Sequence, residues 1–145
     1  MSDLVITQKY DKFDGRIITT EAILINGEEV PVIAEWDTGA TYCSISIEFI
    51  QKFGLVPNKR HEVKSTYSSD VLNAHTLNLI LNHSDLFPIE ASESPILKKT
   101  GIDLLIGMEI IHRGDFAIST YGGTTCFSFR VPSHGLIDFK NEKYK

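Results

Sequence analysis

The residues best placed to do chemistry are Asp37, Thr38 and Gly39, which follow an apolar run from Val30 to Trp36. The next stretch, "ATYCSIS", is again nearly apolar. A carboxylate embedded in this way is costly unless it is hydrogen-bonded or used as an acid or base. The sequence therefore singles out Asp37 as the candidate functional carboxyl group.

A plain turn is the alternative interpretation, because Asp and Gly are both common turn residues. The chain would then be a small β-domain without a site. The triplet of Asp, then Ser or Thr, then Gly also occurs by chance in roughly a few per cent of chains of this length. A turn between surface strands needs neither Trp36 nor a long apolar approach, so we favour a functional carboxyl group over a turn alone.

Two later segments strengthen this interpretation. A hairpin is predicted around a polar tip at Tyr67 to Asp70, and Leu105-Ile106-Gly107 opens a short helix. With Asp37 to Ala40, these segments resemble, in the same order, the retropepsin-like aspartic proteases, a superfamily of retroviral proteases and small bacterial and eukaryotic relatives. The resemblance covers roughly residues 17–119. It is closer to the bacterial members, which often carry "IGM-x-I-I" followed by "GDF", as residues 106–116 do.

The resemblance implies roles for the first motif. Asp37 would act on a water molecule, and Thr38 would hydrogen-bond to its counterpart across a two-fold axis. Gly39 would allow a tight turn and offer its N–H to the carboxylate. Ala40 would be small where the substrate backbone passes.

The resemblance also implies roles for the two later segments. Leu105 would line a wall beside the catalytic acids. Ile106 and Gly107 complete the motif, and Gly107 would let the helix cross close to the Asp37 loop. The hairpin tip, here Thr66, Tyr67 and Ser68, would fold as a flap over an extended peptide.

Aspartic proteolysis uses two carboxylates that share one proton, so that one acts as a base towards water while the other polarises the peptide carbonyl. This chain has one suitable triplet, and the sequences around Asp14 and Asp115 do not fit the pattern. The second acid must come from a second copy. The predicted function is therefore a homodimeric aspartic endopeptidase that cleaves peptide bonds flanked by apolar residues, with Asp37 of both copies on the axis.

Three departures from the retroviral pattern motivate an alternative. Thr41 and Tyr42 stand where retroviral members carry acids that hold the substrate backbone. The flap tip "TYSSDV" is not glycine-rich, and Met108 replaces a basic residue that braces the dimer. The alternative is a weak or inactive dimer of the same fold that binds peptides or serves in assembly.

Local patterns predict the elements around these motifs. Asn26-Gly27 between two β-branched runs indicates a tight hairpin that ends at Asp37. Ser46 can cap a short helix that Gly54 ends. Residues 92–100 are predicted to be a loop, and Gly122-Gly123 to turn a last hairpin. The fold class is mostly β: a small closed antiparallel barrel of the retropepsin-like type with one or two short helices. We expect a single domain over residues 1–145, with its core at about 17–130 and a flexible tail at 131–145.

Bulk composition limits the partners. The 145 residues carry a net charge of −5 and a pI near 5.5, without a Lys/Arg-rich run, which argues against a nucleic-acid partner. The apolar runs are too short to span a bilayer and no secretory signal is recognisable, so we expect a cytoplasmic protein without a membrane partner. Cys43, Cys126 and the five histidines do not fall at metal-ligand spacings. We expect free thiols, no metal and no cofactor.

Overall fold

The structure is a computed structural model that describes residues 3–64 and 68–142. Ten strands and two short α-helices make up most of the described chain. The strands are β1 Leu4–Tyr10, β2 Ile18–Ile25, β3 Glu28–Trp36, β4 Cys43–Ser46, β5 Lys59–Lys64, β6 Ser69–Leu81, β7 Asp85–Ser94, β8 Leu104–Ile106, β9 Asp115–Tyr121 and β10 Thr124–Val131. The helices are α1 Ile47–Phe53 and α2 Met108–Ile111, with 3-10 turns η1 Leu97–Thr100 and η2 Phe139–Asn141.

Six strands form a closed barrel in the order β2-β3-β8-β4-β7-β6, which the pairing of β6 with β2 completes. The prediction of a mostly β, closed barrel with one or two short helices is confirmed, and the helices number two in the described residues. Its pairing differs in one respect, because β3–β8 and β4–β7 are parallel. These parallel pairs place the ends of β3 and β8 side by side, with Trp36 opposite Ile106.

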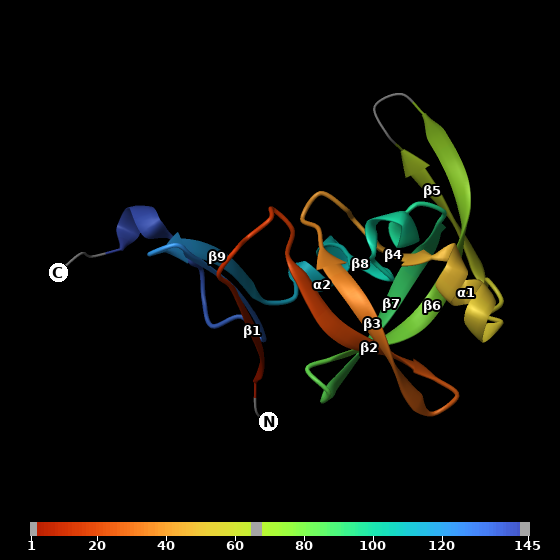
Figure 1. The fold of residues 1–145 in the computed structure, drawn as a ribbon, viewed down its shortest axis with the longest axis horizontal. Coiled ribbons are helices and arrows are strands. Elements are labelled where there is room, and N and C mark those ends of the chain that lie inside the picture. The colour runs from red at the N-terminus through yellow and green to blue at the C-terminus, as the bar shows by residue number, and fades with distance from the viewer. Residues whose placement is uncertain (1–2, 65–67, 143–145) are drawn as a thin grey trace.

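The barrel extends into a hairpin that stands away from the core. Residues 78–80 of β6 close the barrel against β2, while residues 69–73 pair with β5 alone. Figure 1 shows this β5–β6 hairpin projecting from the barrel. The predicted flap is therefore a continuation of a barrel strand, and its root is fixed by the barrel.

A second, three-stranded sheet of order β1-β10-β9 lies beside the barrel (Figure 1). Trp36 joins the barrel to the three-stranded sheet. Its ring packs against Phe116, Phe127 and Phe129 of the sheet, with centroid separations of 6.4, 5.0 and 5.0 Å. Its indole N–H donates to Thr19 Oγ1 at 2.9 Å, so the buried polar group is satisfied. Trp36 is thus a core residue that anchors the end of β3.

Local signals account for the hairpin and the helix. Asn26 and Gly27 have φ values of 50° and 80°, as a two-residue hairpin turn requires. Ser46 caps α1 by accepting the N–H of Phe49, and Gly54 ends it with φ 60°. Among the described residues, no helix is long and apolar enough to cross a membrane.

One predicted loop is wrong. β7 continues to Ser94, so residues 92–94 are strand rather than loop. The reason is a parallel partner: β4 pairs with Ala91 to Ser94 through Cys43 to Ser46. This pairing brings Ser92 to the Asp37 side of the barrel.

Candidate active site

The loop after β3 holds Asp37 by backbone contacts at both ends. Its N–H donates to the carbonyl of Ile106 at 2.9 Å, and its carbonyl accepts the N–H of Ala40 at 3.3 Å. Its carboxylate oxygen Oδ1 accepts the N–H of Gly39 at 2.8 Å. In the part of the chain that the structure describes, no group donates to Oδ2. One carboxylate oxygen is thus fixed by the loop itself, and the other accepts no hydrogen bond from a described residue.

The second motif lies directly behind this loop. Leu105 is half-buried between Glu35 of β3 and Ser44 of β4, and Ile106 is fully buried. A Cβ atom on Gly107 would lie 2.4 Å from the carbonyl oxygen of Tyr42 and 2.8 Å from that of Ala40. Only glycine lets the start of α2 approach the loop this closely.

Helix α2 holds the Asp37 loop through backbone hydrogen bonds. The N–H groups of Met108 and Glu109 donate to the carbonyls of Ala40 and Thr41, at 2.7 and 2.9 Å. The Glu109 carboxylate accepts the N–H of Cys43 at 2.8 Å through Oε1 and that of Glu90 at 3.2 Å through Oε2. The helix therefore fixes the Asp37 loop to β7 as well as to β8.

Comparison with known structures identifies the fold that carries this loop. A crystal structure of a retropepsin-like aspartic protease from Rickettsia conorii matches with a TM-score of 0.55 and 17% identity, over 89% of this chain and 95% of that chain. The chain has the retropepsin-like fold. The solution structure of the simian foamy virus (mac) protease gives a TM-score of 0.48 at 17% identity, over 66% and 92% of the two chains. No family model matches the sequence, and no curated protein does.

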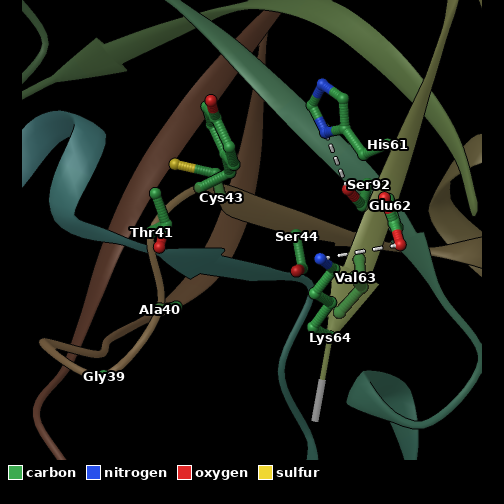
Figure 2. A pocket seen from close by; sticks show the side chains of 11 residues that line it. Gly39, Ala40, Thr41, Cys43, Ser44, His61, Glu62, Val63, Lys64 and Ser92 are labelled. Atoms are coloured by element: carbon green, nitrogen blue, oxygen red, sulfur yellow. Dashed lines mark hydrogen bonds and ion pairs between the residues drawn. The ribbon is translucent and has the colours of Figure 1, made fainter. Parts of the chain in front are cut away.

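In this retropepsin-like fold, a groove of about 460 Å³ opens beside the Asp37 loop. Figure 2 shows Gly39, Ala40 and Thr41 on one side and flap residues on the other. The remaining lining residues are Tyr42, Cys43, Ser44, His61, Glu62, Val63, Lys64 and Ser92. The groove thus runs between the Asp37 loop and the root of the β5–β6 hairpin.

His61 is one of several groove residues that the sequence analysis did not assign to the site. Its ring lies within hydrogen-bond distance of Ser92 Oγ at 3.0 Å and of Glu90 Oε2 at 2.9 Å. The Tyr42 ring lies 5.0 Å from it, so the two rings join the loop to the flap root. Lys59 also pairs with Glu90, and this hydrogen bond, followed by that of His61, lowers the pKa of the Glu90 carboxyl. These contacts fix His61 as a wall of the groove.

The predicted site residues fall into three groups. Asp37, Gly39, Ala40, Ile106 and Gly107 meet at the loop, with Thr38 exposed beside them. Leu105 stands beside this loop but does not line the groove. Ser68 is exposed at the end of the flap, while Thr66 and Tyr67 lie outside the described residues. The roles of all these residues stay predictions.

Cys43 and Cys126 are both free thiols. Cys43 is buried under the groove, and burial, followed by the Glu109 carboxylate, raises the pKa of its thiol. A neutral, buried thiol is a poor nucleophile, so Cys43 is a packing residue. Among the described residues, no group of three or more His, Cys, Asp or Glu side chains could hold a metal ion.

The two hydrogen bonds that the Glu109 carboxylate accepts, from the N–H groups of Cys43 and Glu90, form a clamp whose effect on stability can be tested. Glu109→Gln keeps one acceptor oxygen but puts an amide NH₂ where the other oxygen accepted a backbone N–H. One of the two N–H groups then loses its acceptor, and we expect the free energy of unfolding to fall by about 1–3 kcal/mol. Urea unfolding followed by the fluorescence of Trp36 measures the change.

The matched control is Glu48→Gln, in the first turn of α1, where the carboxylate is exposed. We expect this control to stay within about 0.5 kcal/mol of the parent. Equal unfolding midpoints for the two variants would contradict the clamp.

Proposed function

We propose that this protein is a homodimeric aspartic endopeptidase in which Asp37 of each copy activates a water molecule that attacks a peptide bond. The observation that carries the proposal is the Asp37 carboxylate in the retropepsin-like fold: the Gly39 N–H holds Oδ1, and no described group of the same copy binds Oδ2. Such a carboxylate is oriented through one oxygen, while its other oxygen has no hydrogen-bond donor among the described residues. A second carboxylate opposite it would complete a pair that shares one proton.

The proposed division of labour follows from the chemistry of that pair. The ionised carboxylate removes a proton from water while the protonated one donates a hydrogen bond to the peptide carbonyl. Two acids about 3 Å apart cannot both ionise, so their titrations split, and a mildly acidic pH keeps one proton on the pair. The groove beside Ala40 supplies space for the extended peptide, with the flap hairpin on its far side. We propose a cytoplasmic location for this activity.

The site requires two copies, and this requirement gives the test. We expect the purified protein to cleave a peptide library at mildly acidic pH, with products that flank apolar residues. The rate per chain should rise with protein concentration, because dilution converts dimers into half-sites. A rate per chain that stays constant on dilution, together with a monomer mass, would show that one chain suffices and would overturn the proposal.

The alternative, a peptide-binding or assembly module, is favoured by Thr41 and Tyr42, which leave the groove without the acids of retroviral members. The same experiment separates the two functions. Peptides that bind in a fluorescence polarisation assay but remain uncut at every pH would support the binding module.

A further inference from the structure

The groove beside the Asp37 loop has two ends that differ in structure. Along one side the chain runs from Gly39 to Tyr42, and along the other it runs from Lys64 to His61. Figure 2 shows Gly39 and Lys64 towards one end of the groove and His61 at the other. Because Gly39 donates its N–H to Asp37, the end with Gly39 and Lys64 leads to that carboxylate.

The opposite end is closed by a contact between two aromatic rings. The Tyr42 and His61 rings lie 5.0 Å apart between their centroids, with their planes tilted by 33°. The two residues come from opposite sides of the groove, so their rings meet across it. We call this contact the bar.

Polar contacts fix the His61 half of the bar. The His61 side chain is only 14% exposed, and its ring nitrogens lie 3.0 Å from Ser92 Oγ and 2.9 Å from Glu90 Oε2. Lys59 pairs with the same Glu90 carboxylate. Turning His61 away from the groove would leave these partly buried polar groups without their partners, which costs free energy.

The two halves of the bar share one support. The Glu109 carboxylate accepts the N–H of Cys43, which follows Tyr42, and the N–H of Glu90, which holds His61. One side chain of α2 thus sets the separation of the two sides of the groove at the bar. The Tyr42 side chain is 49% exposed, so it can be changed without opening the core.

The distance from the open end to the bar limits what the groove can hold. His61 to Lys64 are consecutive residues of β5 and span about 10 Å, the length of about three extended residues. An extended peptide that enters from the Asp37 end therefore meets the bar after about three residues. In the two-fold dimer of the proposed function each copy supplies one bar, so both ends of the combined groove are closed.

We propose that the Tyr42–His61 bar restricts this protein to short peptides, with about three residues on each side of the bond that is cut, and excludes longer chains. This inference rests on the proposed function and names the substrate class of the same site. A longer peptide has to part the two rings. Loss of their contact corresponds to about 10-fold in affinity.

Binding is measured with the full-length Asp37→Asn variant, which keeps the groove and should not cut its ligand. The probes are capped peptides of about six residues built from Ala, Leu, Phe and Ser, and the same peptides lengthened by about three alanines at each end. Equilibrium dialysis followed by mass spectrometry gives the dissociation constant of each peptide. We expect the short peptides to bind at least about 10-fold more tightly than the long ones.

Second substitutions in this variant connect the length preference to the bar. Tyr42→Ala removes one ring and should abolish most of the preference, whereas Tyr42→Phe keeps the ring and should keep the preference. The matched control is Tyr121→Ala, which removes a 92% exposed tyrosine of β9 outside the groove and should leave the preference unchanged. Circular dichroism should show the same fold in all these proteins.

The outcomes separate this inference from the peptidase. Equal affinity for the two lengths overturns the inference and leaves the peptidase standing, and so does a preference that persists in Tyr42→Ala. A preference for short peptides that depends on Tyr42, in a protein whose parent cuts no peptide, supports the bar and overturns the peptidase. A parent that neither binds nor cuts peptides of either length overturns both.

Discussion

Asp37→Asn is expected to lower the rate of peptide cleavage by about 10⁴-fold or more, the scale on which hydrolases lose activity when a catalytic group is removed. The Asn side chain has the same shape and can still accept the Gly39 N–H. Its amide can neither take a proton from water nor share one with a second acid. The loss therefore reports chemistry rather than folding, and unfolding midpoints should match those of the parent.

The control for this variant is Asp11→Asn, at an exposed position outside the groove. Cleavage by this control should equal that of the parent. Equal cleavage by Asp37→Asn and the parent would end the assignment of Asp37 as the catalytic acid.

Mixing the two proteins tests whether each active site uses two copies. When an equal amount of Asp37→Asn is added to a fixed amount of parent and subunits exchange, parent homodimers fall to about half of their starting amount. Activity should fall by the same factor and approach zero with excess variant. Unchanged activity in the mixture would mean that each site is complete within one chain.

Features encoded by neighbouring residues could be predicted from the sequence. The Asn26-Gly27 turn needs positive φ at two adjacent positions, and the Ser46 cap satisfies an N–H three residues later. The Asp37 loop was found because its acid stands between apolar segments. The contacts that form the turn and the cap lie within a few positions, so the sequence carries them directly.

Features that depend on distant strands could not be predicted in this way. β1 was not assigned, and it pairs with β10, with Leu4 opposite Val131. His61 was not assigned to the site, because Glu90 and Ser92, which orient its ring, belong to another strand. The end of β7 was missed for the same reason, since its partner β4 lies nearly 50 positions earlier in the chain.

Gly107 combines a local sequence motif with a long-range contact. It was recognised in a local motif, but its physical necessity is a long-range contact with the loop. Gly107→Ala places a methyl group 2.4 Å from the Tyr42 carbonyl oxygen and 2.8 Å from that of Ala40, which accepts the Met108 N–H. We expect the free energy of unfolding to fall by about 3 kcal/mol, at the upper end for overpacking.

The displacement should also reach the active site, because moving α2 weakens the bonds from Met108 and Glu109 to Ala40 and Thr41. Folded Gly107→Ala should therefore cleave peptides poorly at temperatures below its unfolding transition. The matched control is Gly122→Ala, where φ is +60° and the added methyl group meets no atom within 4 Å. In that control, the left-handed backbone should lower the free energy of unfolding by only about 1–2 kcal/mol. Cleavage should stay unchanged. Thermal unfolding at one protein concentration ranks the stabilities of the two variants. A Gly107→Ala protein as stable and as active as the control would show that α2 does not constrain the Asp37 loop.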